Sequence, residues 1–406
     1  MSSSTLPLFP SQLEVPPREV IYDQAGGHVT GKRSTAVIRA QNGGVYSDAN
    51  RTITFHMSAL SDLAIDLSTL YWSYNHSCTS SGNLSVMDEG SYSPIQSLTV
   101  KTASGVTLAT INEYARLCAL LADASMDSQL RASNFHLGFG PDSTRPAGGR
   151  QYKCHLKSLF DQVQKYFYPG LVGGVYIEIQ LRPASQFHHS TSADQSGLSY
   201  TISDCKLEFD TVELSAEIVT AIQKKALTDG VKLAFTSYAY AGYSLSTDTQ
   251  SVISVGNRNR SQKMLLVSFQ DQSLSQNNNA TSQEKTSTRS SAGITSWQIR
   301  NGTSYLPAEP VTSDIQTYLE ISKTFQHNVR GVIDYASFVA GSSKYFIARE
   351  LQVVQSEMSG ASDSSQNATN LDIVLTRENP AAARVDTWVA HDVVVHILGT
   401  SVTVFS

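Results

Sequence analysis

The amino-acid sequence predicts an all-β protein in which two similar halves follow one another. The first observation behind this is an alternation of apolar and polar residues in many short segments. The second is composition, since 40% of the 406 residues are hydrophobic and only 16% are charged, against roughly 25% charged residues in an average soluble protein. The third is a series of strand patterns that recurs in the same order in the second half of the chain. Together they favour two tandem β domains over a disordered chain or a helix-rich enzyme.

Strand patterns dominate the chain. An alternation with a period of two gives a strand one face for a core and one face for polar surroundings. Five segments show it most clearly: 51–57, 96–101, 174–182, 200–212 and 388–398. Residues that favour turns separate the segments, which is typical of antiparallel sheets.

Three segments predict helices. The first spans residues 112–124, the second begins after Ser215 as an N-cap and ends at Thr228, and the third begins near Thr312 or Ser313. The residues expected on the apolar faces are Ile111, Tyr114, Cys118 and Leu121 in the first helix, Ile218, Ile222 and Ala226 in the second, and Ile315, Tyr318, Ser322 and Phe325 in the third. Because these helices are few and short, we expect them to connect strands and not to form a layer.

A long internal repeat indicates duplication. Its three matched pairs are Ser97–Gly105 with Ser296–Gly302, Ile177–Arg182 with Leu371–Arg377, and the strands that begin at Tyr200 and Trp388. The intervals are 199, 194 and 188 residues, and we favour duplication over chance matches between strands. Two copies, each with about eight strands and one internal helix, predict a pair of jelly rolls joined by short helices.

Four parts are therefore expected along the chain. They are an extended N-terminal arm at residues 1–22, a first jelly roll at 23–213, a linking helix at 214–230 and a second jelly roll at 231–406. No basic segment followed by an apolar run opens the chain, so we expect no signal peptide. The segments 247–259 and 273–291 are the candidates for an outer surface, the second because it is almost wholly polar.

Charge and cysteine usage exclude several classes of function. The net charge is −5 and the isoelectric point about 6.1, so we expect no sequence-specific nucleic-acid binding. The basic group Lys32-Arg33, with Arg39 nearby, is better explained by a solvated loop. Widely spaced cysteines favour free thiols in a reducing compartment over a zinc site or a disulfide framework; they are Cys78, Cys118, Cys154 and Cys205.

Three patterns that could carry chemistry are each better explained without it. The run from Gly26 to Lys32 approaches a phosphate-binding loop, but Arg33 replaces the residue that would hold magnesium and a strand follows. His188-His189 could be imagined as metal ligands, yet neighbouring residues of a strand point to opposite faces, and a solvent loop is favoured.

Aromatic residues form the third pattern. A stacking platform for sugars or bases could be built from Tyr166, Phe167, Tyr168, Tyr238, Tyr240 and Tyr243. Aromatic residues at strand spacing more often belong to a core or an interface. The sequence thus predicts no catalytic, cofactor-binding or metal-binding residue.

The order of several segments resembles the double jelly-roll major capsid proteins of polinton-like viruses and virophages, in the tailless double-stranded DNA virus lineage. The segments that carry the resemblance are Ser97–Leu121, Tyr152–Phe160, Tyr168-Pro169, Val175–Leu181, Tyr200–Val212 with the helix after it, Arg260–Phe269, Gln298–Gly302, Tyr305–Pro307 and Pro310. The resemblance covers roughly residues 50 to 406.

The resemblance implies a structural protein and no enzyme. Three copies of the chain would form a pseudo-hexameric homotrimeric capsomer of an icosahedral shell, located in the virion after synthesis inside the host cell. Expected partners are neighbouring capsomers and single jelly-roll penton and minor capsid proteins, and an internal membrane beneath the shell is compatible with the family. The alternatives are a two-module jelly-roll glycan-binding or fibre protein, a two-domain jelly-roll enzyme acting on glycans, and a minor capsid or vertex protein.

Overall fold

The computed structural model describes most of the chain. It covers residues 32–59, 62–79, 85–125, 150–156, 166–190, 198–256, 259, 261–276, 283–325, 335–339, 343–352 and 371–405. The predicted N-terminal arm and the glycines of the loop at 26–31 lie outside these residues. In the described part of the chain, no helix has both the length and the apolar character needed to cross a bilayer.

The first half of the chain forms two facing antiparallel sheets. Its strands are β1 (Arg33–Arg39), β2 (Val45–Tyr46), β3 (Thr52–Ser58), β4 (Leu63–Thr79), β5 (Ser85–Met87), β6 (Ile95–Thr102), β7 (Thr107–Asn112), β8 (Arg150–His155), β9 (Tyr166–Phe167), β10 (Gly174–Leu181), β11 (His188–Ser190) and β12 (Ser199–Glu213). One sheet has the order β1-β12-β4-β8, with β2 on β12 and β9 on β4, and the other has the order β3-β10-β6-β7. Strands β5 and β11 form a small separate pair.

The second half repeats this arrangement. Its strands are β13 (Val231–Leu245), β14 (Gln250–Val255), β15 (Gln262–Asp271), β16 (Ile294–Asn301), β17 (Ser304–Val311), β18 (Phe346–Glu350), β19 (Leu371–Arg377), β20 (Ala383–Leu398) and β21 (Ser401–Phe405). The sheets have the orders β13-β20-β15-β18, with β21 on β20, and β14-β19-β16-β17.

Helices are few and lie between strands. The described α-helices are α2 (Tyr114–Ser125), α4 (Ala216–Thr228), α5 (Gln272–Gln276), α6 (Asp314–Thr324) and α7 (Tyr335–Phe338), and two short 3₁₀ turns cover Pro169–Val172 and Ala184–Gln186. Helix α2 follows β7 and helix α6 follows β17, so the same helix recurs at the same place in each half.

The two halves correspond strand for strand. The pairs are β1 and β13, β3 and β14, β4 and β15, β6 and β16, β7 and β17, β8 and β18, β10 and β19, and β12 and β20. All three matches of the sequence repeat fall on such pairs, namely β6 with β16, β10 with β19 and β12 with β20. Eight principal strands in two sheets, with this shared order, confirm the predicted all-β class and the pair of jelly rolls.

Two of the three predicted helices begin at the N-caps that the sequence indicates. The Ser215 hydroxyl accepts from the Ile218 amide at the start of α4, and the Ser313 hydroxyl accepts from the Gln316 amide at the start of α6. The face predicted for α6 is wrong in one position, because Ile315 is 59% exposed. The inward face carries Thr317 instead, whose hydroxyl accepts a hydrogen bond of 2.9 Å from the Trp297 indole nitrogen.

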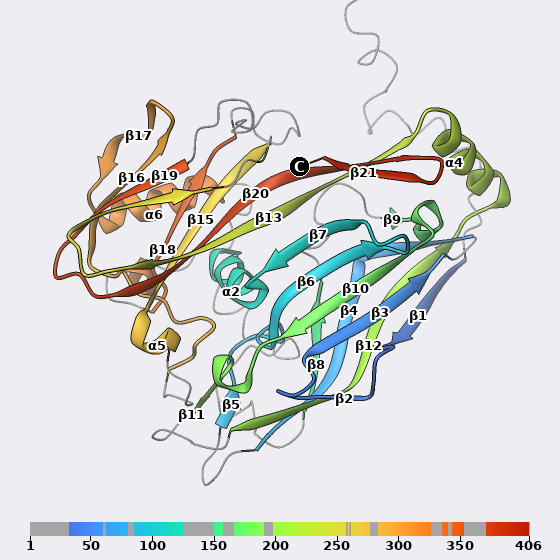
Figure 1. The fold of residues 1–406 in the computed structure, drawn as a ribbon, viewed down its shortest axis with the longest axis horizontal. Coiled ribbons are helices and arrows are strands. Elements are labelled where there is room, and N and C mark those ends of the chain that lie inside the picture. Colours follow the sequence, from blue (N-terminus) through green and yellow to red (C-terminus); the bar gives the residue numbers. More distant parts are fainter. Residues whose placement is uncertain are drawn as a thin grey trace, which may run out of the picture.

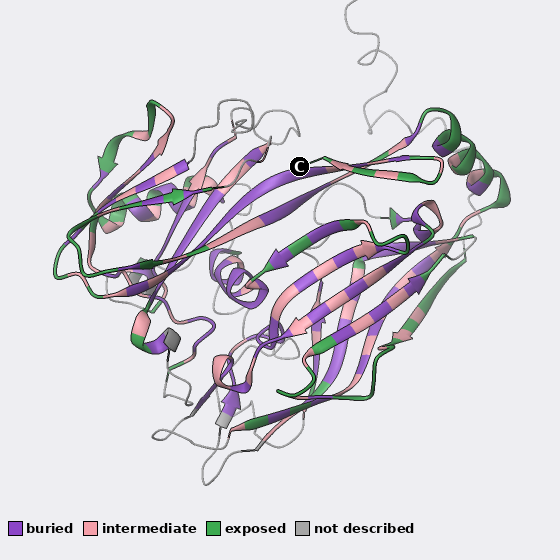
Figure 2. Ribbon diagram, in the orientation of Figure 1, coloured by how far each residue is buried: buried purple, intermediate pink, exposed green. Residues whose placement is uncertain are grey.

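Each roll has an aromatic core. Trp72 is fully buried in the first roll, and Trp297 and Trp388 are buried in the second. Strand β12 alternates between buried and less buried residues, as expected of a sheet with one covered face. Its counterpart β20 is buried at every position from Val385 to Val393, which shows that both faces of this part of the strand are covered (Figure 2).

The two rolls lie side by side (Figure 1). Strands β13 and β20 extend from the second roll over the first, towards α4, and β7 of the first roll packs along β13. Helix α2 lies between the rolls and is buried around most of its circumference, including Arg116 and Asp123. Helix α2 thus lies between two strands in the chain, as expected, but it also packs against both rolls, and the less buried Cys118 and Leu121 do not mark its main packing face.

Neither segment predicted for the outer surface is simply a loop. Residues 250–255 of the first segment form β14, an edge strand of the second roll. In the second segment, Lys285, Thr286, Ser287 and Arg289 are buried against the first roll. Lys285, Thr286 and Arg289 have partners in the first roll, and Ser287 donates to Glu284 of its own segment. This described part of the segment is therefore polar without being a solvated loop, and residues 277–282 lie outside the described residues.

Candidate functional site: the interface between the two jelly rolls

The interface between the rolls has an apolar seam. A small groove along it is lined by Leu67, Leu108 and Phe167 of the first roll and by Leu233, Ala234, Phe235 and Val395 of the second. Beside the seam, the Trp388 indole nitrogen donates a hydrogen bond of 3.2 Å to the carbonyl oxygen of Asn112, at the end of β7. Burial of these side chains contributes a non-directional attraction between the rolls.

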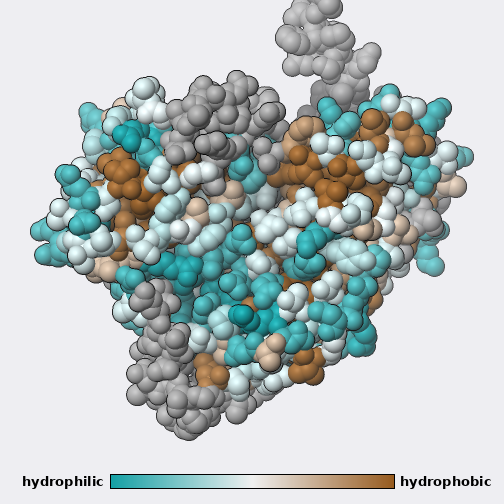
Figure 3. All heavy atoms as spheres, viewed as in Figure 1, coloured by the Kyte–Doolittle hydropathy of each residue, from teal (hydrophilic) through white to brown (hydrophobic). Residues whose placement is uncertain are grey.

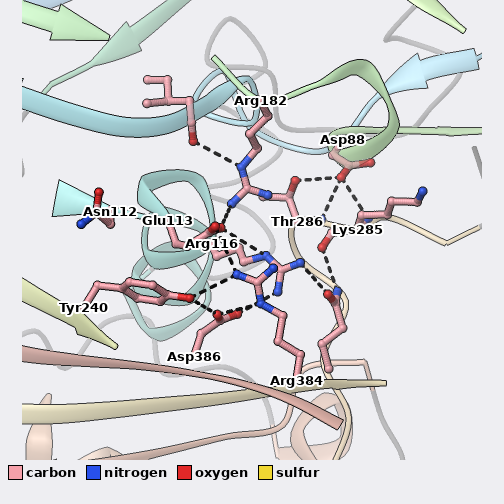
Figure 4. A network of polar contacts seen from close by, with 12 residues as sticks. Asp88, Asn112, Glu113, Arg116, Arg182, Tyr240, Lys285, Thr286, Arg384 and Asp386 are labelled. Carbon is pink, nitrogen blue, oxygen red and sulfur yellow. Dashed lines mark hydrogen bonds and ion pairs between the residues drawn. The ribbon is translucent and has the colours of Figure 1, made fainter. Parts of the chain in front are cut away.

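A buried ionic network continues from the seam (Figure 4). Glu113, between β7 and α2, pairs with Arg182 of the first roll and lies 3.1 Å from Arg384 of the second. Arg116 of α2 contacts Asp386 of β20 at 2.8 Å. Arg384 also contacts Asp386 at 2.9 Å, so the network joins α2 directly to the central strand of the second roll.

Neutral groups complete the network. The Tyr240 hydroxyl donates to Asp386 over 2.8 Å, and Arg116 donates to the Gln270 side-chain oxygen over 2.6 Å. The Gln270 amide nitrogen in turn donates to the carbonyl oxygens of Lys285 and Thr288, at 2.8 and 3.0 Å. The segment after α5 is thereby tied to the same cluster.

The charges of the network stabilise one another despite their burial. Burial by itself would raise the pKa of Glu113, but attraction to Arg182, Arg116 and Arg384 outweighs it and lowers that pKa. Burial likewise opposes ionisation of Asp386, and Arg116 and Arg384 lower its pKa. Glu113 also has a positive φ of 51°, a costly conformation for a residue other than glycine. Both carboxylates are therefore ionised at neutral pH, and the strained residue lies where three arginines meet.

A second polar cluster surrounds Asp88 of the first roll. Its carboxylate accepts from the Lys285 and Thr286 amides at 2.9 and 2.8 Å, and from the Thr286 hydroxyl at 2.8 Å. The other carboxylate oxygen lies 3.0 Å from Nδ1 of His189. Burial would raise the pKa of Asp88, whereas its bonds to His189 and Thr286 lower it. This aspartate binds backbone donors of the second roll as an N-cap does.

The far end of α2 carries a third contact. Asp123 pairs with Arg289 and lies 3.4 Å from Lys344, both from the second roll. The Arg289 guanidinium also lies over the Phe346 ring, 5.5 Å from its centroid. Arg116 and Asp123 are seven residues apart, which is two turns of one helix face. That face of α2 is therefore the first roll's main contact surface.

The two adjacent histidines are buried, so their interpretation as a solvent loop is wrong. His188 lies in β11 and its Nδ1 is 2.9 Å from the carbonyl oxygen of Ala184, while its Nε2 is 2.9 Å from Nε2 of His76. Because a carbonyl can only accept, Nδ1 of His188 carries the proton, and His76 donates to the free Nε2. Burial lowers the pKa of His188 to about 4, and the pair is neutral.

The other candidate residues lie apart from one another. Tyr238 is buried in the core, Tyr240 belongs to the ionic network, and Tyr166 is 45% exposed on β9, so the six aromatic residues form no common platform. No disulfide joins any of the four cysteines, all of which lie in the described ranges, and burial raises the pKa of Cys205 to about 12. In the described ranges, no group of histidine, cysteine and carboxylate side chains has the arrangement of a metal site.

Sequence reasoning missed the interface residues because nothing local distinguishes them. Glu113 and Arg116 fall inside the first predicted helix, Asp386 lies two residues before the strand predicted at 388–398, and Gln270 directly follows the segment Arg260–Phe269. One signal in the sequence does point to them. Arg182 and Asp386 are charged residues next to apolar strand residues, and a charged residue that is buried in a strand needs a partner of opposite charge.

Comparison with solved structures gives extensive matches at low sequence identity. The Faustovirus major capsid protein matches with a TM-score of 0.65 and 8% identity, over 90% of this chain and 90% of that chain. A chain of the PBCV-1 virus capsid matches with a TM-score of 0.64 and 12% identity, over 92% of this chain and 96% of that one. The mavirus major capsid protein matches with a TM-score of 0.54 and 10% identity, over 100% and 96% of the two chains.

Sequence comparisons give no assignment of their own. No family model matches the chain, and no curated protein matches it. The likeness therefore concerns three-dimensional structure, and it extends over both halves of the chain. Together with the strand order common to the two halves, it shows that this chain has the double jelly-roll fold of these capsid proteins.

Proposed function

We propose that this chain is the major capsid protein of an icosahedral double-stranded DNA virus, and that it acts as a homotrimer. The observation that supports this most strongly is the pairing of two jelly rolls of identical strand order in one chain, in an arrangement similar to three viral capsid proteins. Three such chains supply six similar rolls, which can tile a surface as a hexamer would. The proposed role is structural and needs no catalytic step.

Several finer points belong to the same proposal. The chain has four parts, namely an arm at 1–22, a first roll at 23–213, a linking helix at 214–230 and a second roll at 231–406. Each chain then fills two of the six positions of the pseudo-hexamer, one with each roll. The proposed virus is of the polinton-like or virophage type. Its partners are neighbouring capsomers and single jelly-roll penton and minor capsid proteins, and its location is the virion.

The test is the mass and shape of the purified full-length protein. We expect light scattering to give about three times the chain mass of 44.1 kDa, and negative-stain images of the same peak to show a hexagonal outline. A protein that stays monomeric up to the highest concentration measured would contradict the proposal. It would favour a two-module glycan-binding protein, which binding to a glycan array would then support.

A further inference from the structure

The contact between the two rolls is heterologous, because each roll contributes a different surface. The first roll contributes β7 and α2, which follow one another in the chain. The second roll contributes β13 and β20, together with the segment around Lys285 and Arg289. Since the two rolls have the same fold, each also carries the counterpart of the surface that the other one uses.

The second roll's counterpart of β7 and α2 is exposed. Ala115 and Ala119 are the second and sixth residues of α2, and Ile315 and Leu319 are the second and sixth residues of α6. Ala115 and Ala119 are 0% and 2% exposed, whereas Ile315 and Leu319 are 59% and 50% exposed. The same helix face is thus covered in one roll and open in the other.

The strand before this helix shows the same contrast. Strand β7 packs along β13 and buries three of its six residues, while its counterpart β17 leaves five of its eight residues exposed. Tyr305 of β17 is 44% exposed. Ile315 and Leu319 are therefore exposed apolar residues on the helix that corresponds to α2, and the strand before it is exposed as well.

The first roll likewise leaves the receiving surface open. Strand β1 is the counterpart of β13, and its outer residues are exposed, with Val37 at 55%. Strand β12 is the counterpart of β20, yet only β20 is buried on both faces. Within the described residues, each chain thus makes this contact once, between its own two rolls. It also exposes both surfaces that the same contact would need between two chains, one on each roll.

We propose that the β17–α6 surface of one chain, with Ile315 and Leu319 at its centre, docks on the β1–β12 side of the first roll of a second copy. A heterologous contact between similar units repeats head to tail and can close into a ring. The inference rests on the proposed homotrimer and specifies which surfaces hold it together. The α6 side of this contact is apolar, whereas the β1–β12 side carries ion pairs such as Arg33–Asp210 and Arg39–Asp204.

The test compares three single substitutions in the full-length protein. Leu319→Asp changes the α6 side, Val37→Asp changes the β1 side, and Leu227→Asp is the control, since Leu227 is a 70% exposed leucine on helix α4. We expect the first two to weaken self-association by about 10-fold or more, because a charge is placed in a desolvated contact. Light scattering over a concentration series measures this, and circular dichroism verifies that each variant is folded.

The outcomes separate this inference from the proposed function. A wild-type protein that stays monomeric contradicts the homotrimer itself. A wild-type trimer that tolerates both Leu319→Asp and Val37→Asp as well as Leu227→Asp overturns the assigned surfaces and leaves the homotrimer in place. A trimer lost in the first two variants and kept in the control supports both.

Cross-linking of the wild-type protein gives a result that does not depend on any variant folding. Lys323 lies on the same helix, one turn after Leu319. In trimers co-assembled from isotopically labelled and unlabelled copies, we expect Lys323 to form links between copies to lysines of the first roll, such as Lys206 beside β1. Links between copies that join Lys323 only to second rolls would overturn the head-to-tail arrangement.

Discussion

At the scale of single residues, the interface between the rolls depends on charges that are buried with all their partners. Asp386 accepts from Tyr240 and contacts both Arg116 and Arg384. Removing a charge from water costs several kcal/mol, and only close partners recover it. Loss of one member is therefore more costly than the loss of an exposed ion pair.

The variant Asp386→Asn tests this argument. It removes one of the two carboxylates that Arg116 and Arg384 share, the other being Glu113, and we expect it to lower the free energy of unfolding by about 3–5 kcal/mol. Glu178→Gln is the control, since Glu178 and its partner Lys101 are each 34% exposed, and a surface pair contributes roughly 0–1 kcal/mol. Urea denaturation at fixed protein concentration measures both, and equal losses would refute the role of burial.

The buried His76–His188 pair predicts a dependence of stability on pH. The pKa of His188 is about 4 in the fold, below the ordinary value of about 6.5, so the unfolded chain binds a proton more readily. The stabilisation is complete above about pH 6.5 and is lost as the pH falls towards 4. Between pH 7 and pH 5 this histidine accounts for a loss of about 2 kcal/mol.

A variant without the titrating group separates this effect from others. In His188→Gln, unfolding free energies measured at pH 7 and pH 5 should differ by less than in the wild-type protein. The carboxylates Glu113, Asp386 and Asp88 have lowered pKa values, so their contribution is lost only at lower pH, below their ordinary values near 4. An unchanged difference between pH 7 and pH 5 would show that His188 does not carry the effect.

At the scale of elements, strands were the most predictable part of the protein. Strand β19 spans the segment Leu371–Arg377 that the internal repeat matches, and β10 and β12 differ from the predicted alternating segments by one residue at one or both ends. An alternation of apolar and polar residues indicates a strand with one face covered by a core. It fails to identify what covers the other face, so the burial of β20 on both faces was not predicted.

Helix α2 and the segment at 283–291 show the other limit of sequence reasoning. A one-sided apolar pattern describes a helix on one core, whereas α2 packs against both rolls and uses Arg116 and Asp123 for the second contact. Lys285 and Thr286 are polar because they bind Asp88 and a backbone carbonyl of the first roll. Such partners lie far away in the sequence, and only the fold brings them together.

The linking helix α4 offers a test at the same scale. Only Val219 and Ala226 of this helix are buried, so its stability depends strongly on its N-cap. We expect Ser215→Ala to destabilise α4 by about 1 kcal/mol, and Ser215→Asp to preserve it. Hydrogen exchange of the α4 amides measures the effect locally, and equal exchange in both variants would contradict it.

At the scale of the whole molecule, the two rolls are expected to unfold together. Separating them would expose the apolar seam and leave Arg116, Asp386 and Asp88 without their partners, so a chain with one folded roll is unfavourable. Calorimetry should show a single transition for the wild-type protein. Two well-separated transitions would contradict this coupling.

The surface of the molecule also carries an unpaired apolar area at the C-terminal hairpin. Figure 3 shows one group of apolar side chains over β21 and the adjoining end of β20, and a second group at the left of the view. Leu398 and Phe405 are 45% and 49% exposed there. This area is separate from the surfaces assigned above to the contact between chains.

The covalent link between the rolls changes the thermodynamics of assembly. In a ring of six rolls made from three chains, half of the roll-to-roll contacts form within a chain at a high effective concentration and cost no translational entropy. The other half must form between diffusing molecules. The intramolecular contact, with its buried ions, can therefore be strong enough to maintain the fold while the contact between chains stays weak enough to be broken and remade. A growing shell built in this way can release a misplaced subunit without unfolding it.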